Sequence, residues 1–169
     1  TNGKTIENYI DTRLHGDLMI SLRPPPNDWE KSWRKNNESH PLVNQWNFLG
    51  LGICVDDLES ASSYYSNLGY TKLNNAIKKK EWRTVCQEFF LGGVLFELIE
   101  SKEGSIYSDS IKRRGDGVAE IIFQVSDIHK EIDRLAIRGT QILQVSNDKK
   151  MVSIQSGLKG NILTRLIEK

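Results

Sequence analysis

The length, composition and charge of this chain exclude several classes of protein. It has 169 residues, of which 38% are hydrophobic and 27% are charged, as is typical of a globular domain. The 23 basic and 22 acidic residues leave a formal net charge of +1, which favours neither nucleic acid nor an anionic membrane surface as a partner. No apolar run reaches the roughly 18 residues that a membrane-spanning helix needs.

The cysteines and the first residues bear on the setting of the protein. Cys54 and Cys86 fall in predicted strands, which favours reduced core thiols and a cytoplasmic location. Without a CxxC motif or a Cys/His cluster, we expect no structural zinc. The chain opens TNGKTIENY, without a signal-peptide pattern and without a methionine, which fits either a trimmed protein or a domain of a larger biosynthetic one.

Residues 1–46 form an N-terminal extension with a composition of its own. Its stretch IENYIDTRL (6–14) is compatible with a short helix, and 16–22 has the character of a strand. Trp29 and Trp33 are too apolar to remain in water. We therefore expect the extension to pack on the main domain or to link it to a partner.

A regular pattern begins at residue 47. The run NFLGLGICV predicts a strand over 47–55, and Asp56 or Asp57 is expected to cap a helix that ends at Gly69. Three further strands are predicted, over 70–78, 81–91 and 94–100. The order over residues 47–100 is thus β-α-β-β-β.

The same order returns after a polar linker at 101–116. A strand over 118–125, a helix over 127–139 and three more strands are predicted within residues 117–169. The motifs VDDL and VSDI match at an offset of 70 (125 − 55), and FELIE and TRLIE match at 68 (168 − 100). We interpret the repeat as an internal duplication, which predicts an α+β fold of two βαβββ modules in one domain over 47–169.

These motifs resemble those of the vicinal-oxygen-chelate superfamily, which includes glyoxalase I, methylmalonyl-CoA epimerase, extradiol dioxygenases and bleomycin-resistance proteins. The likeness rests on GLGICVDDLESASSYYSNLGY, GGVLFELIE, GVAEIIFQVSDI and the glycine at 139. It implies that the two modules curve into a cup-shaped mixed sheet. In the metal-using members, the first and last strands of each module carry one ligand each inside the cup.

Carried over to this chain, the four ligand positions fall on Gly50, Glu97, Glu120 and Arg165. Glycine has no side-chain donor, and a guanidinium keeps its proton and repels a cation. We therefore expect the metal site to be lost, with no other cofactor in its place. The histidines do not restore it: His129 falls on an outer helix, and His15 and His40 lie in the extension.

Strand alternation places the same residues on partly buried faces. Glu97 and Arg165 each lie between two aliphatic side chains of one strand face, where a charge is costly unless it is paired. Two interpretations follow. Glu97, Glu120 and Arg165 form a buried ion-pair cluster, or they form the floor of a pocket where Arg165 stabilises an oxyanion and a glutamate moves a proton.

Further residues are candidates for ligand binding in the cup. The missing side chain at position 50 is expected to leave room for a bulky ligand or for a neighbouring aromatic side chain. Aromatic and amide side chains would line the rest. The full set is Gly50, Trp82, Phe90, Phe123, Gln124 and Gln155.

Two functional hypotheses follow from the resemblance and the charges. The first is a metal-independent enzyme, of isomerase, epimerase or lyase type, that acts next to a carbonyl of a small organic or acyl-thioester substrate. The alternative is a non-catalytic protein of the bleomycin-resistance kind that binds or sequesters a small molecule. Either one is compatible with a homodimer or with neighbouring domains of a larger protein.

Overall fold

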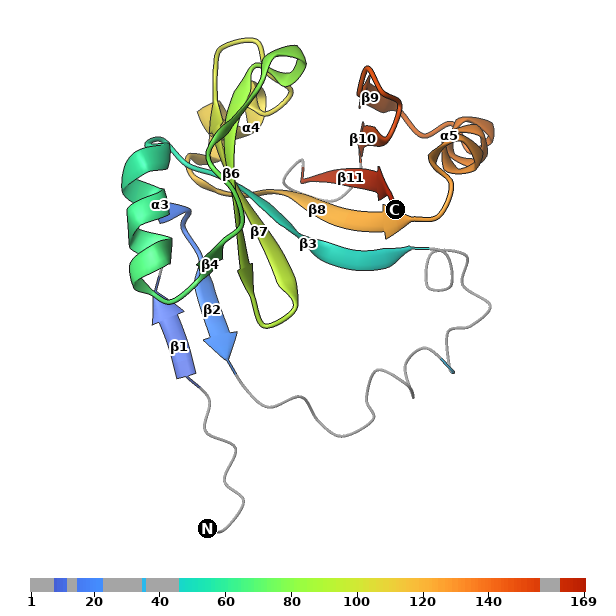
Figure 1. Cartoon of the computed structure of the whole chain (residues 1–169). Helices are drawn as coiled ribbons and strands as arrows, with labels where there is room; N and C mark the ends of the chain where they lie inside the picture. Colours follow the sequence, from blue (N-terminus) through green and yellow to red (C-terminus); the bar gives the residue numbers. More distant parts are fainter. Residues whose placement is uncertain (1–7, 12–14, 23–34, 36–45, 156–161) are drawn as a thin grey trace.

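The structure is a computed structural model of the whole chain, and it describes residues 8–11, 15–22, 35, 46–155 and 162–169 (Figure 1). The expectations on Trp29, Trp33 and His40 concern residues outside these ranges. In the described part of the chain, no helix is both long and apolar enough to cross a membrane.

A mixed sheet of nine strands forms the body of the molecule, in the order β4-β6-β7-β3-β8-β11-β10-β9 with β5 paired to β6. The sheet is curved and unclosed, with helix α3 at one end of the molecule and helix α5 at the other (Figure 1). Its strands are β3 (Asn47–Cys54), β4 (Thr71–Lys72), β5 (Ile77–Lys79), β6 (Thr84–Leu91), β7 (Val94–Ser101), β8 (Gly117–Val125), β9 (Ile142–Val145), β10 (Met151–Gln155) and β11 (Leu163–Glu168). The helices are α3 (Leu58–Asn67), α4 (Ser108–Arg114), α5 (Ile128–Ile137) and the 3-10 turn η2 (Lys80–Trp82).

Strand pairing confirms the predicted α+β fold of two βαβββ modules. The first strands of the modules, β3 and β8, pair antiparallel at the centre of the sheet. Each is also parallel to the last strand of its own module, β3 to β7 and β8 to β11. The two modules therefore repeat one arrangement, and their inner faces meet along the β3–β8 seam.

Both main helices begin and end where the sequence predicts. Asp57 accepts a hydrogen bond from the amide of Ser60 at 3.0 Å, and Asp127 accepts one from the amide of Lys130 at 3.0 Å. Of the two predicted caps of the first helix, Asp57 is thus the one used. Gly69 follows α3 with a φ of +89°, a backbone conformation that glycine adopts without a steric cost.

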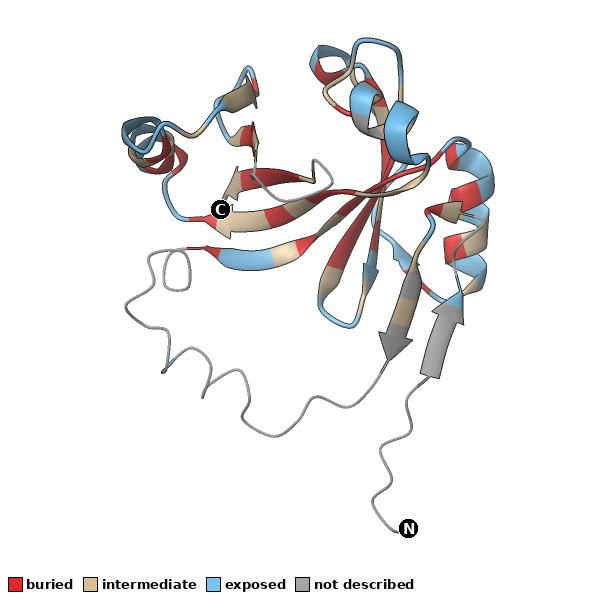
Figure 2. Cartoon of the chain, turned by 180° about the vertical axis from the view of Figure 1, so that it is seen from behind, coloured by how far each residue is buried: buried red, intermediate tan, exposed pale blue. Residues whose placement is uncertain are grey.

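The hydrophobic core is divided into three clusters. One packs α3 against β3, β6 and β7, and a second packs α5 against β8, β10 and β11. The third contains Cys54, Trp82, Cys86, Ile99, Tyr107, Ala119 and Leu163. Figure 2 shows the buried residues concentrated in the strands of the sheet, while the helices expose much of their outer surface.

Four predicted elements need correction. The helix proposed for 6–14 is wrong over 8–11, because Asn8–Asp11 forms strand β1, which pairs antiparallel with β2 (Met19–Leu22). The strand predicted at 81–91 begins only at Thr84, since η2 precedes it and Arg83 has a φ of +52°. The strand predicted at 70–78 is split into β4 and β5, and the linker contains helix α4.

The start of the chain contacts the first module. The side chains of Leu18 and Ile20 pack against the core cluster of α3. The hydroxyl of Tyr64 donates a hydrogen bond to the carbonyl of Asp11 at 2.6 Å. The boundary between extension and domain at residues 46 and 47 stays a prediction.

Candidate functional site

The site is built around three buried ionisable side chains on the inner face of the sheet, which we call the triad: Glu97, Glu120 and Arg165. They come from β7, β8 and β11, and each is at most 1% exposed. Register explains how the two acids meet, because Gly52 of β3 lies opposite Glu97 on one side and Glu120 on the other. At Gly52 an added Cβ would overlap the Glu120 side chain, so glycine gives this acid its space.

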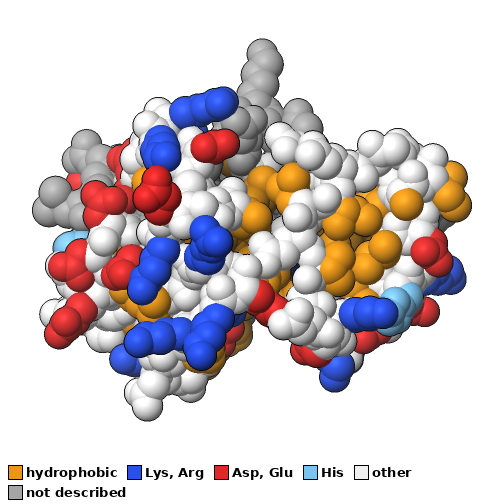
Figure 3. Space-filling view, turned by 90° about the horizontal axis from the view of Figure 1, so that it is seen from above, with side chains coloured by type: hydrophobic (Ala, Val, Ile, Leu, Met, Phe, Trp, Pro, Cys, Tyr) orange, Lys and Arg blue, Asp and Glu red, His pale blue; other side chains and the backbone are white. Residues whose placement is uncertain are grey.

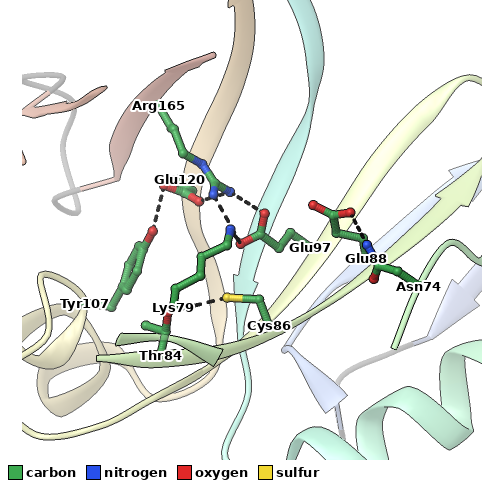
Figure 4. A network of polar contacts seen from close by, with 9 residues as sticks. All are labelled: Asn74, Lys79, Thr84, Cys86, Glu88, Glu97, Tyr107, Glu120 and Arg165. Atoms are coloured by element: carbon green, nitrogen blue, oxygen red, sulfur yellow. Dashed lines mark hydrogen bonds and ion pairs between the residues drawn. The ribbon is translucent and has the colours of Figure 1, made fainter. Parts of the chain in front are cut away.

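The guanidinium of Arg165 joins the two carboxylates (Figure 4). Its Nη1 and Nη2 donate to Oε1 and Oε2 of Glu97 at 3.2 and 2.9 Å. The same Nη2 lies 2.5 Å from Oε1 of Glu120 as an ion pair. A two-pronged contact of this kind holds a guanidinium in a fixed plane and position.

Two further side chains complete the network. Lys79 of β5 reaches Oε1 of Glu97 with its Nζ at 2.7 Å, and its side chain is 15% exposed. Tyr107, which precedes α4, donates its hydroxyl to Oε2 of Glu120 at 3.0 Å. Burial raises the pKa of Tyr107 well above its ordinary value, and the charge of Glu120 adds to this. Tyr107 is therefore a hydrogen-bond donor at neutral pH.

The two acids of the triad have pKa values shifted in opposite directions. Burial raises the pKa of Glu97, but the charges of Arg165 and Lys79 outweigh burial and hold the pKa at about 2. Burial also raises the pKa of Glu120, and the charge of Glu97 acts in the same direction, so this pKa stays above its ordinary value. Burial lowers the pKa of Arg165, but the carboxylates overcome it and raise that pKa well above its ordinary value.

Three buried polar groups near the triad lack a hydrogen-bond partner among the described residues. They are Arg165 Nε, Trp82 Nε1 and Ser153 Oγ. The Trp82 ring centroid lies 5.7 Å from Cζ of Arg165, and Ser153 of β10 is the register partner of Arg165. Unpartnered buried donors are costly, so this inner face has unused capacity to bind an electron-rich atom.

The residues present do not fit the metal that the fold family implies. In the described part of the chain, no group of three or more His, Cys, Asp or Glu side chains could hold a metal ion. The two carboxylates at the family's ligand positions are already bound to Arg165. A divalent ion beside this guanidinium would meet a like charge with only two acids to offset both.

The triad is closed off from the described cavities. Three cavities, of about 650, 260 and 340 Å³, are not lined by any triad residue.

The turn η2 covers one side of the triad, where the ring of Trp82 lies over Arg165. The amide of Gln144 donates to the carbonyl of Glu81 at 2.8 Å, and the carboxylate of Glu81 accepts from the amide of Asn147 at 3.3 Å. These exposed contacts tie η2 of the first module to the second.

The structure brings some of the predicted ligand-binding residues to the triad and leaves others apart. Trp82 lies beside Arg165. The expectation of open space at Gly50 is wrong, because an added Cβ would overlap the carbonyl of Leu95. Phe123 packs in the core cluster of α5, against Trp46.

The remaining three candidates make no described contact with the triad. Phe90 is 41% exposed, near the β6–β7 turn. Gln124 and Gln155 are half-buried, and none of the described contacts joins them to the triad. Their roles in ligand binding stay predictions.

Sequence reasoning missed Lys79, Tyr107 and Gly52. Lys79 is the middle residue of a lysine run that reads as solvated surface. Tyr107 lies in a segment that was predicted as a polar linker. Its separation of four residues from Ile111 is typical of apolar side chains on one face of a helix. Only the strand register identifies Gly52 as the glycine between the two acids.

The cysteines are core residues, as predicted. Both are free and buried. Burial is the main cause that raises the pKa of Cys86 to about 12. A thiol with such a pKa stays protonated and unreactive at neutral pH.

Comparisons with known proteins agree with this architecture. Residues 51–151 match the family model of the glyoxalase/bleomycin resistance protein/dioxygenase superfamily. A methylmalonyl-CoA epimerase from Mycobacterium tuberculosis is 20% identical, with a TM-score of 0.60 over 73% of this chain and 87% of that chain. No match was found among curated proteins.

Two other solved structures have a similar sequence identity and TM-score. A Streptomyces coelicolor methylmalonyl-CoA epimerase variant in complex with 2-nitronate-propionyl-CoA is 17% identical, with a TM-score of 0.64 over 75% of this chain and 99% of that chain. A hypothetical protein from Bacillus halodurans is 19% identical, with a TM-score of 0.61 over 73% and 94% of the two chains. At such identities the likeness concerns the fold alone.

Proposed function

The chain belongs to the glyoxalase/bleomycin resistance protein/dioxygenase superfamily, and we propose that it is a metal-independent enzyme that moves a proton at a carbon next to a carbonyl. The observation that carries the proposal is the position of Arg165. Its guanidinium lies between the carboxylates of the two modules, 2.9 Å from Glu97 and 2.5 Å from Glu120. A fixed cation there can stabilise the negative charge that develops on a carbonyl oxygen.

Glu120 is the acid of the triad that suits proton transfer. Its pKa is raised by burial and by Glu97, which makes its carboxylate a stronger base than an ordinary one near neutral pH. Glu97, with a pKa of about 2, is a weak base. In this proposal Glu97 positions Arg165 and leaves the proton to Glu120.

The reaction proceeds in two balanced steps. Glu120 takes the proton from the carbon next to the carbonyl, and the electron pair of that C–H bond moves to the carbonyl oxygen. Arg165 stabilises the enolate that forms, aided by the unpartnered Nε1 of Trp82. Glu120 then returns the proton to the same carbon as the carbonyl re-forms. Return to the opposite face inverts that carbon, as in an epimerase, and return to the original face gives proton exchange alone.

An acyl thioester is the substrate class that we favour. The proton next to a thioester carbonyl is more acidic than that next to an ester, so a carboxylate suffices as base. A structural neighbour was crystallised with 2-nitronate-propionyl-CoA, an acyl-CoA compound. Elimination of a leaving group from the same enolate, as in a lyase, would use the same residues.

Entry of a substrate requires the inner face to open. The segment β5–η2 carries both Lys79 and Trp82. Two exposed hydrogen bonds of Glu81 and the packing of the Trp82 ring against Arg165 tie it to the second module. Movement of η2 would uncover the Arg165 side, whereas β5 is paired with β6 in the sheet. A cytoplasmic location and a homodimer or multidomain assembly are further parts of the proposal.

Exchange of substrate protons for deuterium tests the chemistry directly. The protein is incubated in D₂O with a panel of acyl-CoA thioesters, and deuterium at the carbon next to the carbonyl is measured by mass spectrometry. We expect exchange with the wild type and with Glu59→Gln, an exposed control on α3. Glu120→Gln should be slower by about 100-fold or more, within the range for a catalytic base. Equal exchange by Glu120→Gln would overturn the proposed role.

A non-catalytic role is the second candidate, and the ion pairs within the buried triad favour it. Both oxygens of Glu97 are bound and every triad side chain is buried, as in a purely structural ion-pair cluster. A binding protein of the resistance kind is the form of this role that the superfamily suggests. If no thioester exchanges while aromatic small molecules raise the melting temperature of the wild type, this second candidate is the correct one.

A further inference from the structure

A basic cleft lies beside the triad, on the outer side of the β5–η2 segment. We call it the basic cleft: a cavity of about 340 Å³ lined by Lys78, Lys79, Lys80, Arg83, Thr84, Val85, Lys102 and Glu103. Five of these eight residues are cationic and one is acidic, a formal charge of +4 (5 − 1). Because the whole chain carries only +1, positive charge is concentrated at this place.

The cations of the basic cleft are held together by the fold. The amide of Lys102 donates to the carbonyl of Arg83 at 2.9 Å, which joins the segment after β7 to the start of β6. Arg83 Nη1 donates to the carbonyl of Glu103 at 3.4 Å, and its guanidinium lies against Gly104, where a Cβ would overlap it. Arg83 and Lys102 therefore face one cavity from two segments far apart in the sequence.

Lys79 separates the basic cleft from the triad. It lines the cavity, and its Nζ is engaged by Glu97, so it contributes little charge to the cleft itself. The other four cations have no carboxylate neighbour in the lining except Glu103. Figure 3 shows Lys and Arg side chains, with Asp and Glu side chains among them, on one half of the face seen from above, beside a hollow with hydrophobic side chains.

We infer that the basic cleft binds a small ligand that carries adjacent phosphate groups, such as a diphosphate. Lys and Arg side chains converging from two segments are suited to phosphate oxygens. The volume is near the lower end of the range for small-molecule sites, which fits a diphosphate better than a nucleic acid. The inference stands apart from the proposed reaction, although the diphosphate of a coenzyme A would bring an attached thioester close to Lys79 and the triad.

Calorimetric titration of the whole chain with inorganic pyrophosphate tests the inference. The test variant is Lys80→Gln/Lys102→Gln, two exposed residues outside the triad network. The matched control is Lys112→Gln/Arg113→Gln, two exposed cations of α4 that do not line the cleft. We expect saturable binding to the wild type and to the control. The dissociation constant of the test variant should be higher by about tenfold or more, because each lost hydrogen bond to a charged group weakens the binding free energy.

Three further arms separate the possible outcomes. Coenzyme A should show the same loss in the test variant, and pantetheine, which has no phosphate, should bind neither protein through the cleft. Glu120→Gln should bind pyrophosphate like the wild type even if it exchanges no substrate protons. Absence of saturable pyrophosphate binding, an equal loss in the control, or loss in Glu120→Gln would each overturn the inference.

Discussion

Glu97 and Arg165 occupy equivalent positions in the two modules, separated by 68 residues (165 − 97). At this position of the last strand, one module has an acidic side chain and the other has a cationic one. The two side chains form an ion pair between the modules. With Glu120 and Lys79, the network holds two carboxylates and two cations. It is therefore balanced by its own side chains, without an added ion.

Substitution of Glu97 should be the most damaging change in the network. Glu97→Gln leaves Arg165 and Lys79 without their shared carboxylate in a buried site, and we expect a loss of about 3–5 kcal/mol in the free energy of unfolding. Glu120→Gln should cost clearly less, because Arg165 keeps its two-pronged contact with Glu97. Urea denaturation at neutral pH measures both. Equal losses would show that the two acids do not differ as described.

The pKa of Glu97 predicts a specific dependence of stability on pH. Its folded pKa of about 2 lies below the ordinary value of 4.5. Between these values the unfolded chain binds more protons than the folded one, so stability falls as the pH falls. The difference in unfolding free energy between wild type and Glu97→Gln should be constant above about pH 5 and shrink toward pH 2.

The contribution of Glu120 to stability should depend on pH in the opposite direction. Its raised pKa means that the folded state holds this proton more tightly, which favours folding at low pH and disfavours it as the pH rises through the folded pKa. The opposite pH dependences of the Glu97→Gln and Glu120→Gln variants therefore serve as controls for each other. A pH-independent difference for Glu97→Gln would contradict the low pKa of Glu97.

Two carboxylates cap the N-terminus of each main helix, and they occupy equivalent positions in the two modules. Besides the aspartates, Glu100 accepts from the amide of Leu58 at 3.2 Å, and Glu168 accepts from the amide of Ile128 at 3.3 Å. A glutamate near the end of the last strand of each module thus contacts the start of the helix in that module. This contact explains why the sequence motif IE closes both modules.

Removal of the first cap should weaken α5 by a limited amount. Asp127→Ala should lower the free energy of unfolding by about 1 kcal/mol, the usual effect of losing an N-cap side chain. Asp133→Ala, an exposed position inside the same helix, is the matched control and should have a smaller effect. Chemical denaturation of both variants gives the comparison, and an equal loss would show that Asp127 does not act as a cap.

Local signals in the sequence were sufficient for the long elements. Alternating apolar residues and an aspartate cap predicted β3, α3, β8 and α5 nearly to the residue. The turn η2 and helix α4 were missed because long-range contacts fix them: Trp82 packs in the inner cluster, and Tyr107 binds Glu120. No local period encodes such contacts.

At the scale of the whole molecule, the resemblance to the superfamily predicted that Glu97, Glu120 and Arg165 meet, and strand alternation agreed with their burial. Their exact pairing required the strand register. The expectation of space at Gly50 was wrong because the backbone of Leu95, on the neighbouring strand β7, occupies the position that a Cβ would need. The residue pattern of one strand does not encode how closely its neighbour approaches.

The proposed chemistry requires the guanidinium of Arg165 to act at a position where the resemblance to the superfamily implies a metal ligand. The most direct measurement is the rate of deuterium exchange into an acyl-CoA thioester by protein stripped with EDTA, compared with the same protein after return of Mg²⁺, Mn²⁺, Co²⁺, Ni²⁺ or Zn²⁺. We expect the stripped protein to exchange as fast as before, with no gain from any ion. Exchange that appears only after a metal is returned would contradict the account.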